Sequence, residues 1–311
     1  MNILLTGAAG QLGSELTDLL SDHGRLIATD RFVPATASDN WVEMDICDSG
    51  RLEDLLNCLK PGLIVNTAAF TAVDLAESEP EIAFALNAEL PARLAHWTEN
   101  NDARLIHYST DYVFDGSSSK PYTETDSPKP QNVYGDSKLA GEIAIEQSQC
   151  VHAILRTSWV YSSHGKNFLL SMLDLASRGL TLKVVDDQNG CPTWARNLAA
   201  ASDSVIRKWA VSMAGFESGV YHYRDNKILS WYDFARTIFR LGVNAGLLEQ
   251  EPEMYPVPSA EFPQPARRPE RSVLDTQRIQ NVFNIHPACF DHSVQTVINE
   301  IAAGGLNQEK T

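Results

Sequence analysis

The sequence contains few features that would place the protein in a membrane or in a disulfide-stabilised fold. It has no run of 18 apolar residues, the length that a transmembrane helix needs. The N-terminus lacks the basic flank and apolar core of a signal peptide. The five cysteines are odd in number and show no CxxC spacing, which argues against a disulfide framework and a structural zinc site. Together these absences favour a cytoplasmic protein without a membrane partner.

Basic residues are also scarce. The chain has 25 Lys and Arg against 40 Asp and Glu, which gives a formal net charge of −15. This charge would repel a nucleic-acid backbone, so no nucleic-acid partner is expected, and an anionic substrate needs a locally basic site. None of the eight histidines stands in an HExxH or HxxxH pattern, so a metal-dependent hydrolase is not indicated and no metal ligand is assigned.

Apolar strands alternate with amphipathic helices through the first half of the chain. The strands read as continuous Ile, Leu and Val runs, as a parallel sheet covered on both faces requires. The fold class is therefore α/β, with a doubly wound parallel sheet, and the length of 311 residues leaves room for a smaller C-terminal α/β domain. The expected strands are 2–6, 26–30, 63–66, 104–109 and 152–158, and the expected helices are 11–20, 51–59, 81–100 and 134–147.

The second half of the chain has a looser rhythm of elements. Segment 255–269 packs five prolines into a short stretch, which predicts an ordered loop without regular structure. Ser230 is the expected N-cap of the helix that follows it. Helices are expected at 166–179, 193–210 and 230–242, and strands at 180–185 and 219–223.

Three glycines, Gly7, Gly10 and Gly13, stand between the first strand and the first helix. In this context a GxxGxxG spacing indicates a dinucleotide site: the glycines allow a tight turn, close approach of the backbone to a pyrophosphate, and close helix packing. The N-terminus of the helix then holds the phosphates. Asp30, at the end of the second strand, is placed to bond the adenosine ribose. Asp45, in "MDICD", is placed beside the adenine ring, with a helix cap as the alternative interpretation.

The stretch "IATDRF" bears on the choice of coenzyme. Asp30 favours NADH because it accepts a bond from a free 2'-hydroxyl, whereas Arg31 can pair with the 2'-phosphate of NADPH. The two effects nearly cancel, so we expect both coenzymes to be used, with NADPH modestly ahead.

Residues 1–161 are expected to form an NAD(P)-binding Rossmann domain that also receives 193–223, and 162–311 to form mainly an interleaved substrate-binding domain.

Tyr134 and Lys138 are four residues apart and share one face of an expected helix. A neighbouring ammonium stabilises a phenolate, so we expect Lys138 to lower the pKa of Tyr134 and make it a proton donor to a carbonyl oxygen. A surface tyrosine beside a solvated lysine is the alternative. Ser109 and Thr110 end the fourth expected strand, where α/β sheets bind their ligands, and this supports the catalytic interpretation.

At this point the sequence resembles the dTDP-4-dehydrorhamnose reductase family, within the extended short-chain dehydrogenase/reductase superfamily. The resemblance lies in "NTAAFTAVDLAESEP", "HYSTDYVFDG", "NVYGDSKLAGE", "LRTSWVY", "DDQNGCPT" and "ARRPERSVLDT", which follow the order of the family and span most of the chain. It implies an enzyme of dTDP-rhamnose and polysaccharide biosynthesis. The implied reaction is reduction of the C4 keto group of dTDP-4-dehydro-L-rhamnose by NADPH, with NADH also accepted.

The resemblance assigns roles to residues of this chain. Tyr134 donates a proton to the C4 oxygen, Lys138 binds the nicotinamide ribose, and Thr110 bonds the same oxygen as Tyr134. The implied substrate-binding residues are Thr110, Asp111, Trp159 and Arg268. The alternative for Trp159 is a place in the core. The alternative for Arg268 is a solvated charge run with Arg267 and Arg271, which the match of Arg268 to the Arg-Pro pair of the family disfavours. The cofactor-binding residues are Gly7, Gly10, Gln11, Leu12, Gly13, Asp30, Arg31, Asp45, Ile46, Ala69, Phe70, Thr71, Tyr108, Tyr134 and Lys138.

Several alternatives stay open at the level of the sequence. A nucleotide-sugar 4-epimerase or epimerase-reductase shares the triad, but an epimerase-reductase often has a thiol beside the catalytic hydroxyl, where this chain has Asp111. A non-catalytic regulatory subunit, similar to the methionine adenosyltransferase beta subunit, would not need the intact triad. Some family members are associated with magnesium, and Glu15 is either a ligand or a glutamate placed favourably against its helix dipole. The expected partner is a nucleotide-sugar, and the expected state a monomer or homodimer.

Overall fold

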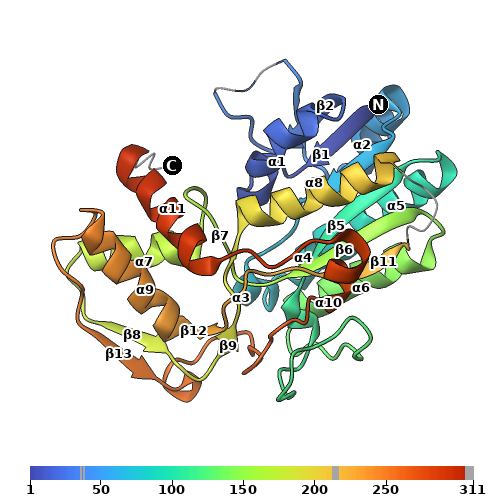
Figure 1. Ribbon diagram of the computed structural model, residues 1–311. Helices are drawn as coiled ribbons and strands as arrows, with labels where there is room; N and C mark the ends of the chain where they lie inside the picture. Colours follow the sequence, from blue (N-terminus) through green and yellow to red (C-terminus); the bar gives the residue numbers. More distant parts are fainter. Residues whose placement is uncertain (36, 38, 212–216, 305–311) are drawn as a thin grey trace.

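The centre of the molecule is a seven-stranded sheet whose strands all run parallel (Figure 1). The computed structural model describes residues 1–304 except 36, 38 and 212–216. The strand order β11-β6-β5-β4-β1-β2-β3 reverses between β1 and β4, which opens a crevice at the carboxyl ends of these strands. The strands are β1 Asn2–Thr6, β2 Arg25–Asp30, β3 Trp41–Glu43, β4 Leu63–Asn66, β5 Arg104–Thr110, β6 Val151–Thr157 and β11 Gly219–His222.

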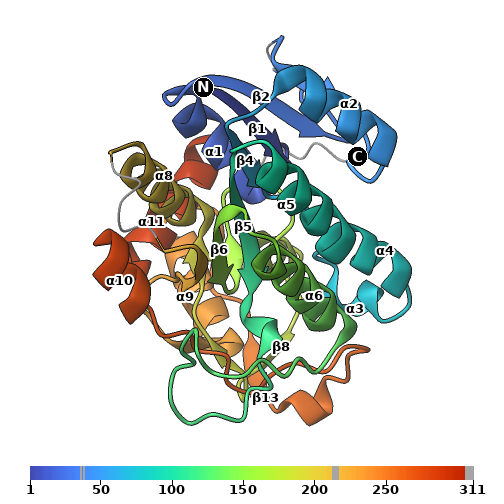
Figure 2. The same ribbon diagram turned by 90° about the vertical axis from the view of Figure 1, so that its right-hand side faces the viewer.

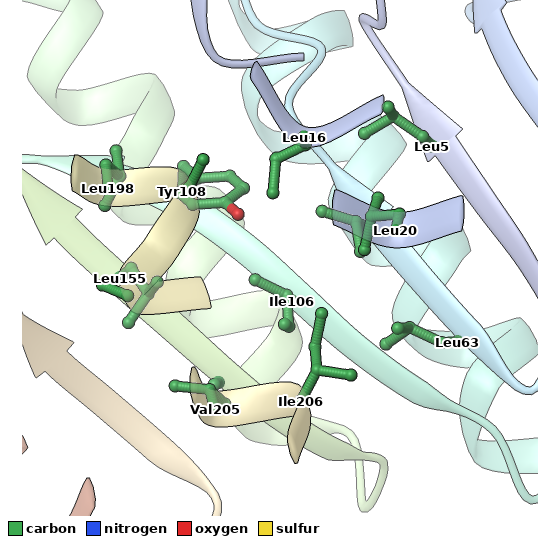
Figure 3. Close-up of a cluster of buried hydrophobic side chains, with 14 of the residues drawn as sticks. Leu5, Leu16, Leu20, Leu63, Ile106, Tyr108, Leu155, Leu198, Val205 and Ile206 are labelled. Carbon is green, nitrogen blue, oxygen red and sulfur yellow. The ribbon is translucent and has the colours of Figure 1, made fainter. Parts of the chain in front are cut away.

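Helices cover both faces of this sheet (Figure 2). On one face, α1 (Gln11–Ser21) and α8 (Ala195–Val211) pack with the strands into one apolar cluster, part of which is drawn in Figure 3. On the other face, α2 (Ser49–Leu59), α5 (Leu90–Asn100) and α6 (Val133–Gln147) form a second cluster. The doubly wound parallel sheet expected from the sequence is therefore confirmed.

A smaller part of the chain forms a separate apolar cluster beside the sheet, at the left of Figure 1. It is built from α7 (Phe168–Ser177), α9 (Trp231–Asn244), α11 (Phe290–Gly304) and the strand β8 (Leu182–Val185). Ser230 caps α9 as expected, because its hydroxyl accepts a bond from the backbone N–H of Asp233. The remaining elements are α3 Val73–Ala76, α4 Pro80–Phe84, a π-turn at Ala85–Glu89, short 3-10 turns at Asp111–Val113 and Ser259–Glu261, β7 Val160–Tyr161, β9 Asn189–Gly190, β10 Thr193–Trp194, β12 Leu229–Ser230, β13 Met254–Val257 and α10 Gln277–Phe283.

The proline-rich segment 255–269 corrects one expectation. Its first residues belong to β13, which pairs with β8 in parallel and contains Pro256. A two-stranded sheet has a free edge on each strand, so the missing N–H of Pro256 is tolerated where it faces away from the partner.

The expected helix 81–100 is also interrupted, because a π-turn at Ala85–Glu89 separates α4 from α5. Such turns are frequent at functional sites.

Helix α6, which carries Tyr134 and Lys138, is fixed to the sheet by a buried ion pair. The Arg156 guanidinium on β6 donates two bonds to Glu142 on α6, at 2.9 Å to Oε1 and 2.5 Å to Oε2, and both residues are buried. At the start of the helix, the Asn132 side chain accepts from the N–H of Gly135 at 2.7 Å. The two bonds between Arg156 and Glu142 thus fix the position of α6 along β6, because both can form in only one relative placement of the two elements.

We expect Glu142→Gln to lower the free energy of unfolding by about 3–5 kcal/mol, because it leaves the Arg156 charge buried without its counterion. Urea unfolding measures the change. The matched control is Glu89→Gln, which breaks the exposed pair with Arg93 and should cost less than about 0.5 kcal/mol. The double variant Glu142→Met, Arg156→Met should recover most of the loss. Equal effects of the two single substitutions would contradict the role given to the buried pair.

Candidate active site

The crevice beside β1 and β4 is a pocket of about 410 Å³. It is lined by the glycine loop after β1, by the ends of β2, β5 and β6, and by α6. The structure thus brings nearly all of the expected cofactor residues together: Gly7, Gly10, Gln11, Leu12, Gly13, Asp30, Arg31, Asp45, Ile46, Ala69, Thr71, Tyr108, Tyr134 and Lys138 all line it. Phe70 does not line it; its backbone N–H and carbonyl oxygen are both bonded to the Asn87 side chain.

The glycine loop has the shape that a dinucleotide site requires. Gly7 has a positive φ of 68°, and a Cβ atom there would lie 2.6 Å from the backbone nitrogen of Ala68, so only glycine fits. Asp30 fastens the loop, since its Oδ2 atom accepts from the N–H of Ala9 at 3.0 Å. Gly10 stands at the N-cap of α1, whose first N–H groups have no partner within the helix. These residues fit the adenine dinucleotide that the glycine spacing predicts.

A loop from the smaller part of the chain reaches this pocket and adds a residue that the sequence did not indicate. The Gln11 side chain accepts from Ser162 at 3.0 Å and from Asn167 at 2.9 Å, and its amide donates to the carbonyl oxygen of Lys166 at 3.4 Å. Lys166 and Gly165 consequently line the pocket beside Gly10. A cation at this position complements a phosphate group. No local pattern marks Lys166, because its place depends on contacts with α1.

Two buried hydroxyl groups also line the pocket and have no hydrogen-bond partner among the described residues. They are Ser109 Oγ and Thr157 Oγ1, at the ends of the adjacent strands β5 and β6. Buried hydroxyls are normally bonded, so these two atoms are available to a ligand in the pocket. The other lining residues absent from the expected set are Thr29, Met44, Thr67, Ala68, Leu86, Val160 and Leu198.

Tyr134 and Lys138 lie on one face of α6, as their spacing predicts, and both line the pocket. Lys138 is buried and its Nζ atom donates to the carbonyl oxygen of Tyr108 at 2.5 Å. Burial lowers the pKa of Lys138 to about 8, and the nearby Glu142 carboxylate partly opposes this effect.

The pKa of Tyr134 corrects an expectation. Burial raises it to about 12, whereas the Thr110 hydroxyl acts in the opposite direction and the Asp111 charge adds to the rise. Lys138 is not among the groups that shift the pKa of Tyr134, and its amine donates to the carbonyl oxygen of Tyr108. The expected lowering is therefore wrong for this arrangement, and Tyr134 keeps its proton at neutral pH.

Asp111 lies behind Thr110 and holds its hydroxyl. Thr110 Oγ1 donates to Asp111 Oδ1 at 3.1 Å and accepts from the N–H of Tyr112 at 3.1 Å, while Ser272 donates to the other carboxylate oxygen. Burial raises the pKa of Asp111 to about 7, and the bonds from Ser272 and Thr110 only partly compensate. The triad hydroxyl of Thr110 is thus oriented by a carboxyl group that titrates near neutrality.

Trp159 is held in a strained conformation between two parts of the chain. Its φ is 49°, a left-handed value that is unusual for a bulky residue and typically costs about 1–3 kcal/mol. Its ring stacks on that of Trp231, with centroids 3.5 Å apart. Gly190 also lies against the Trp159 ring. A Cβ atom on Gly190 would be 2.5 Å from a ring atom, so glycine is required there. Trp159 is half-buried, but it is not among the residues that line either pocket of the structure.

A second pocket, of about 350 Å³, lies in the smaller part of the chain. Its wall is mostly apolar, with Lys183 and Arg268 as cations. Arg268 donates to both carboxylate oxygens of Asp74, at 3.1 and 2.8 Å, and these bonds hold the pKa of Asp74 below its usual value. The lining residues are Val73, Tyr112, Phe168, Met172, Lys183, Val184, Val185, Gln188, Trp231, Phe262, Gln264 and Arg268. Only Arg268 was expected, because the others come together from distant segments.

The two pockets adjoin through a pair of tyrosines. Tyr134 lines the first pocket and Tyr112 lines the second, and their ring centroids are 5.9 Å apart in an edge-to-face contact. The two pockets therefore lie next to each other at this pair of rings. This is the arrangement that a transfer between a dinucleotide and a second, larger molecule needs.

Glu15 does not belong to a magnesium site in this structure. Arg196 on α8 donates to Glu15 Oε2 at 2.8 Å and to Glu300 Oε1 on α11 at 2.5 Å, so a guanidinium lies between the two carboxylates. Among the described residues no group of three or more His, Cys, Asp or Glu side chains could hold a metal ion. The residues present therefore do not fit magnesium, because their charge is already balanced by Arg196.

One protein-family model covers nearly the whole chain. The model described as the RmlD substrate binding domain matches residues 1–303. Reductases named dTDP-4-dehydrorhamnose reductase, from Salmonella typhimurium and Escherichia coli, are each 40% identical to it, with 97% of this chain and 98% of each relative covered. The chain belongs to the dTDP-4-dehydrorhamnose reductase family.

Solved structures of the reductase family agree with this assignment. A dTDP-4-dehydrorhamnose reductase from Clostridium acetobutylicum has a TM-score of 0.85 at 35% identity, covering 97% of this chain and 99% of that one. The reductase from Bacillus anthracis, solved in complex with NADP, has a TM-score of 0.82 at 29% identity, covering 96% and 99%. A UDP-glucose 4-epimerase from Thermus thermophilus has a TM-score of 0.77 at 21% identity, which shows the fold alone. No described helix is long and apolar enough to cross a membrane.

We expect the stability of the protein to fall as the pH rises from about 4 to 7, partly because of Asp111. Unfolded aspartate has a pKa near 3.9, whereas that of folded Asp111 is about 7. The neutral carboxyl is accommodated below pH 4, and burying its charge costs stability as the pH rises through 7. Asp111→Asn should therefore reduce the difference in unfolding free energy between pH 5 and pH 8 by roughly 2–3 kcal/mol. Urea unfolding at both pH values measures it.

The control for this experiment is Asp126→Asn. Hydrogen bonds from Thr123 lower the pKa of this exposed carboxylate, so its contribution is lost as the pH falls, which is the opposite sign. A pH dependence that is unchanged in Asp111→Asn would mean that Asp111 is ionised throughout. Asp225, another buried carboxyl with a pKa raised to about 7, is present in both variants and cancels in the comparison.

Proposed function

We propose that the protein reduces the C4 keto group of dTDP-4-dehydro-L-rhamnose to give dTDP-L-rhamnose, with NADPH as the reductant. The observation that carries the proposal is the junction of two pockets at Tyr134, one with a dinucleotide glycine loop and one with an apolar wall and two cations. The names of the relatives at 40% identity and the NADP complex of the Bacillus anthracis reductase support the same substrate and coenzyme. The chain has all three triad residues, Thr110, Tyr134 and Lys138, which a non-catalytic subunit would not need.

The residues at the junction suit reduction of a ketone. Bound NADPH supplies the hydride. The Tyr134 hydroxyl keeps its proton until negative charge develops on the C4 oxygen, because burial raises its pKa to about 12. Thr110 and Tyr134 would both face that oxygen, and hydroxyl donors held in place stabilise developing charge more than mobile water does. The buried Lys138 is close enough to the pocket to bind the ribose of the coenzyme.

The second pocket suits a nucleoside diphosphate sugar. Arg268 would bind the diphosphate, while its two bonds to Asp74 hold the guanidinium in one orientation. The aromatic and aliphatic wall would receive the base. We also propose that Asp111 and Trp159 contact the sugar, as the family resemblance implies. Cations at the pockets supply the local positive charge that a dianionic substrate needs in a protein of net charge −15.

The division of the chain follows from the same contacts. We propose that residues 1–161, joined by 193–223, form the coenzyme domain, since α8 and β11 pack with the large sheet. Residues 162–311 form mainly the substrate domain, and the last of them, 305–311, lie outside the described residues. We further propose a cytoplasmic enzyme that acts as a monomer or homodimer, in line with its biosynthetic relatives and its unpaired cysteines.

Incubation with NADPH and 4-keto-6-deoxy-L-mannose, linked to dTDP, UDP or GDP, tests the function. We expect the loss of NADPH absorbance to be fastest with the dTDP sugar, and the product to be dTDP-L-rhamnose by chromatography. The matched control is Tyr134→Phe, which should bind NADPH normally and turn over 10²- to 10⁴-fold more slowly, because the ring remains while the proton donor is lost. No oxidation of NADPH with any of the three sugars would refute the proposal.

The choice of coenzyme is tested with Arg31→Ala. Arg31 lines the coenzyme pocket next to Asp30, whose Oδ1 atom accepts from the N–H of Arg31 at 2.7 Å. We expect a wild-type ratio of kcat/KM for NADPH over NADH within about thirtyfold. The substitution should lower kcat/KM for NADPH tenfold or more, about 1.4 kcal/mol, and spare NADH. An unchanged value for NADPH would show that Arg31 makes no contact with the 2'-phosphate.

A further inference from the structure

A chain of buried hydrogen bonds runs from β1 to the amine of Lys138. Thr6 Oγ1 donates to Asn66 Oδ1 at 2.6 Å, and Asn66 Nδ2 donates to His107 Nδ1 at 3.0 Å. His107 Nε2 then lies 3.4 Å from Lys138 Nζ. Thr6, Asn66, His107 and Lys138 are all buried, and the chain crosses the neighbouring strands β1, β4 and β5 before it reaches α6. No role in the reaction has so far been given to its first three members.

The directions of these bonds determine which nitrogen of His107 carries the proton. The described hydrogen bonds give the Thr6 hydroxyl one acceptor, the Asn66 carbonyl oxygen, so the Asn66 amide group faces His107. His107 Nδ1 must then accept, and a neutral imidazole with Nδ1 as acceptor has its hydrogen on Nε2. Burial keeps the His107 ring neutral, since its pKa lies well below the ordinary value.

The consequence falls on Lys138. An ammonium group has three donors and no acceptor, so it cannot form a hydrogen bond with an N–H that points at it, whereas a neutral amine can accept one. The Nε2–H of His107 is therefore compatible with a deprotonated Lys138 and opposes the charged form. The bond from Lys138 to the Tyr108 carbonyl oxygen serves both forms, because an amine also donates.

We propose that His107, held in one tautomer by Asn66 and Thr6, is a positioning residue that makes the Lys138 amine release its proton more readily. The pKa of Lys138, lowered by burial to about 8, agrees with this direction. In the proposed reaction, on which this part of the inference rests, Lys138 can then supply the proton that restores the Tyr134 hydroxyl after Tyr134 has given its own to the product. The N–H bond of Lys138 breaks and the O–H bond of Tyr134 forms again, with no other reactant.

No other described ionisable group near Lys138 opposes its charged form in the way that the His107 N–H does. Glu142 on α6 favours the ammonium, but its charge is already paired with Arg156. His152 on β6 is buried and has its pKa lowered by burial, so it is neutral as well. The Tyr134 phenol, on the same face of α6 as Lys138, is neutral because its pKa is raised, whereas the Tyr108 phenol is bonded to Ser202 on α8.

The tautomer is measured directly in the protein as it is, by two-dimensional ¹H–¹⁵N NMR of chains labelled with ¹⁵N-histidine. The His107 signals are identified by their loss in His107→Gln. We expect a protonated Nε2 and an unprotonated Nδ1 that stay unchanged across the neutral pH range. A protonated Nδ1 would overturn the proposal. Because this result does not depend on any substrate, it stands or falls separately from the proposed reductase activity.

The effect on Lys138 is measured as the alkaline limb of the pH profile of kcat/KM. Asn66→Asp should protonate His107 Nδ1 and turn Nε2 into an acceptor, so the limb should move upward by about one pH unit or more. Thr6→Val frees the Asn66 amide to turn and adds no charge. It should move the alkaline limb upward as well, by less than Asn66→Asp does. The control is His152→Asn. It removes a buried histidine that does not belong to this row of hydrogen bonds, so the alkaline limb of the pH profile should stay in place. A limb that does not move in Thr6→Val and Asn66→Asp would overturn the proposal.

Discussion

The site depends on how rigidly α6 is held against the sheet. Tyr134 and Lys138 both project from this helix, so a small rotation would remove both from the coenzyme pocket. The buried pair of Arg156 and Glu142 prevents such a rotation, because the bidentate bond has one geometry and breaking it leaves a charge in an apolar interior. The Arg156 guanidinium also lies 5.1 Å from the ring centre of Phe114, which further compensates for its desolvation.

The charge distribution of the molecule differs from its net charge. A chain of net charge −15 concentrates cations where the proposed anionic ligands bind: Arg31 and Lys166 at the coenzyme pocket, Lys183 and Arg268 at the second one. Carboxylates also lie at these sites, Asp30 and Asp45 at the coenzyme pocket and Asp74 on Arg268. More distant acidic side chains weaken the sites little, since screening limits their reach to about 8–10 Å. The two tyrosines at the junction remain protonated, and this keeps the point of reaction neutral until charge develops there.

The two parts of the molecule are fastened together by contacts that the reaction does not use directly. Arg196 joins α1 of the large sheet to α11 of the smaller part, and the Trp159–Trp231 stack joins the end of β6 to α9. The strained backbone of Trp159 persists because its ring is packed against both Trp231 and Gly190. Gln11 performs a similar function at the coenzyme pocket, where it binds the loop that carries Lys166.

The sequence alone determined the elements whose signals are local. Continuous apolar runs identified strands such as Asn2–Thr6 and Leu63–Asn66, and the spacing of Tyr134 and Lys138 placed both on one helical face. The glycine loop could be recognised because its backbone conformation excludes other residues. Only the tertiary structure decided which partner each polar group has: Arg196 for Glu15, Asp74 for Arg268, Tyr108 for Lys138. These partners are far apart in the chain, and burial changes the pKa of a group, as for Tyr134, in ways that no short pattern of residues encodes.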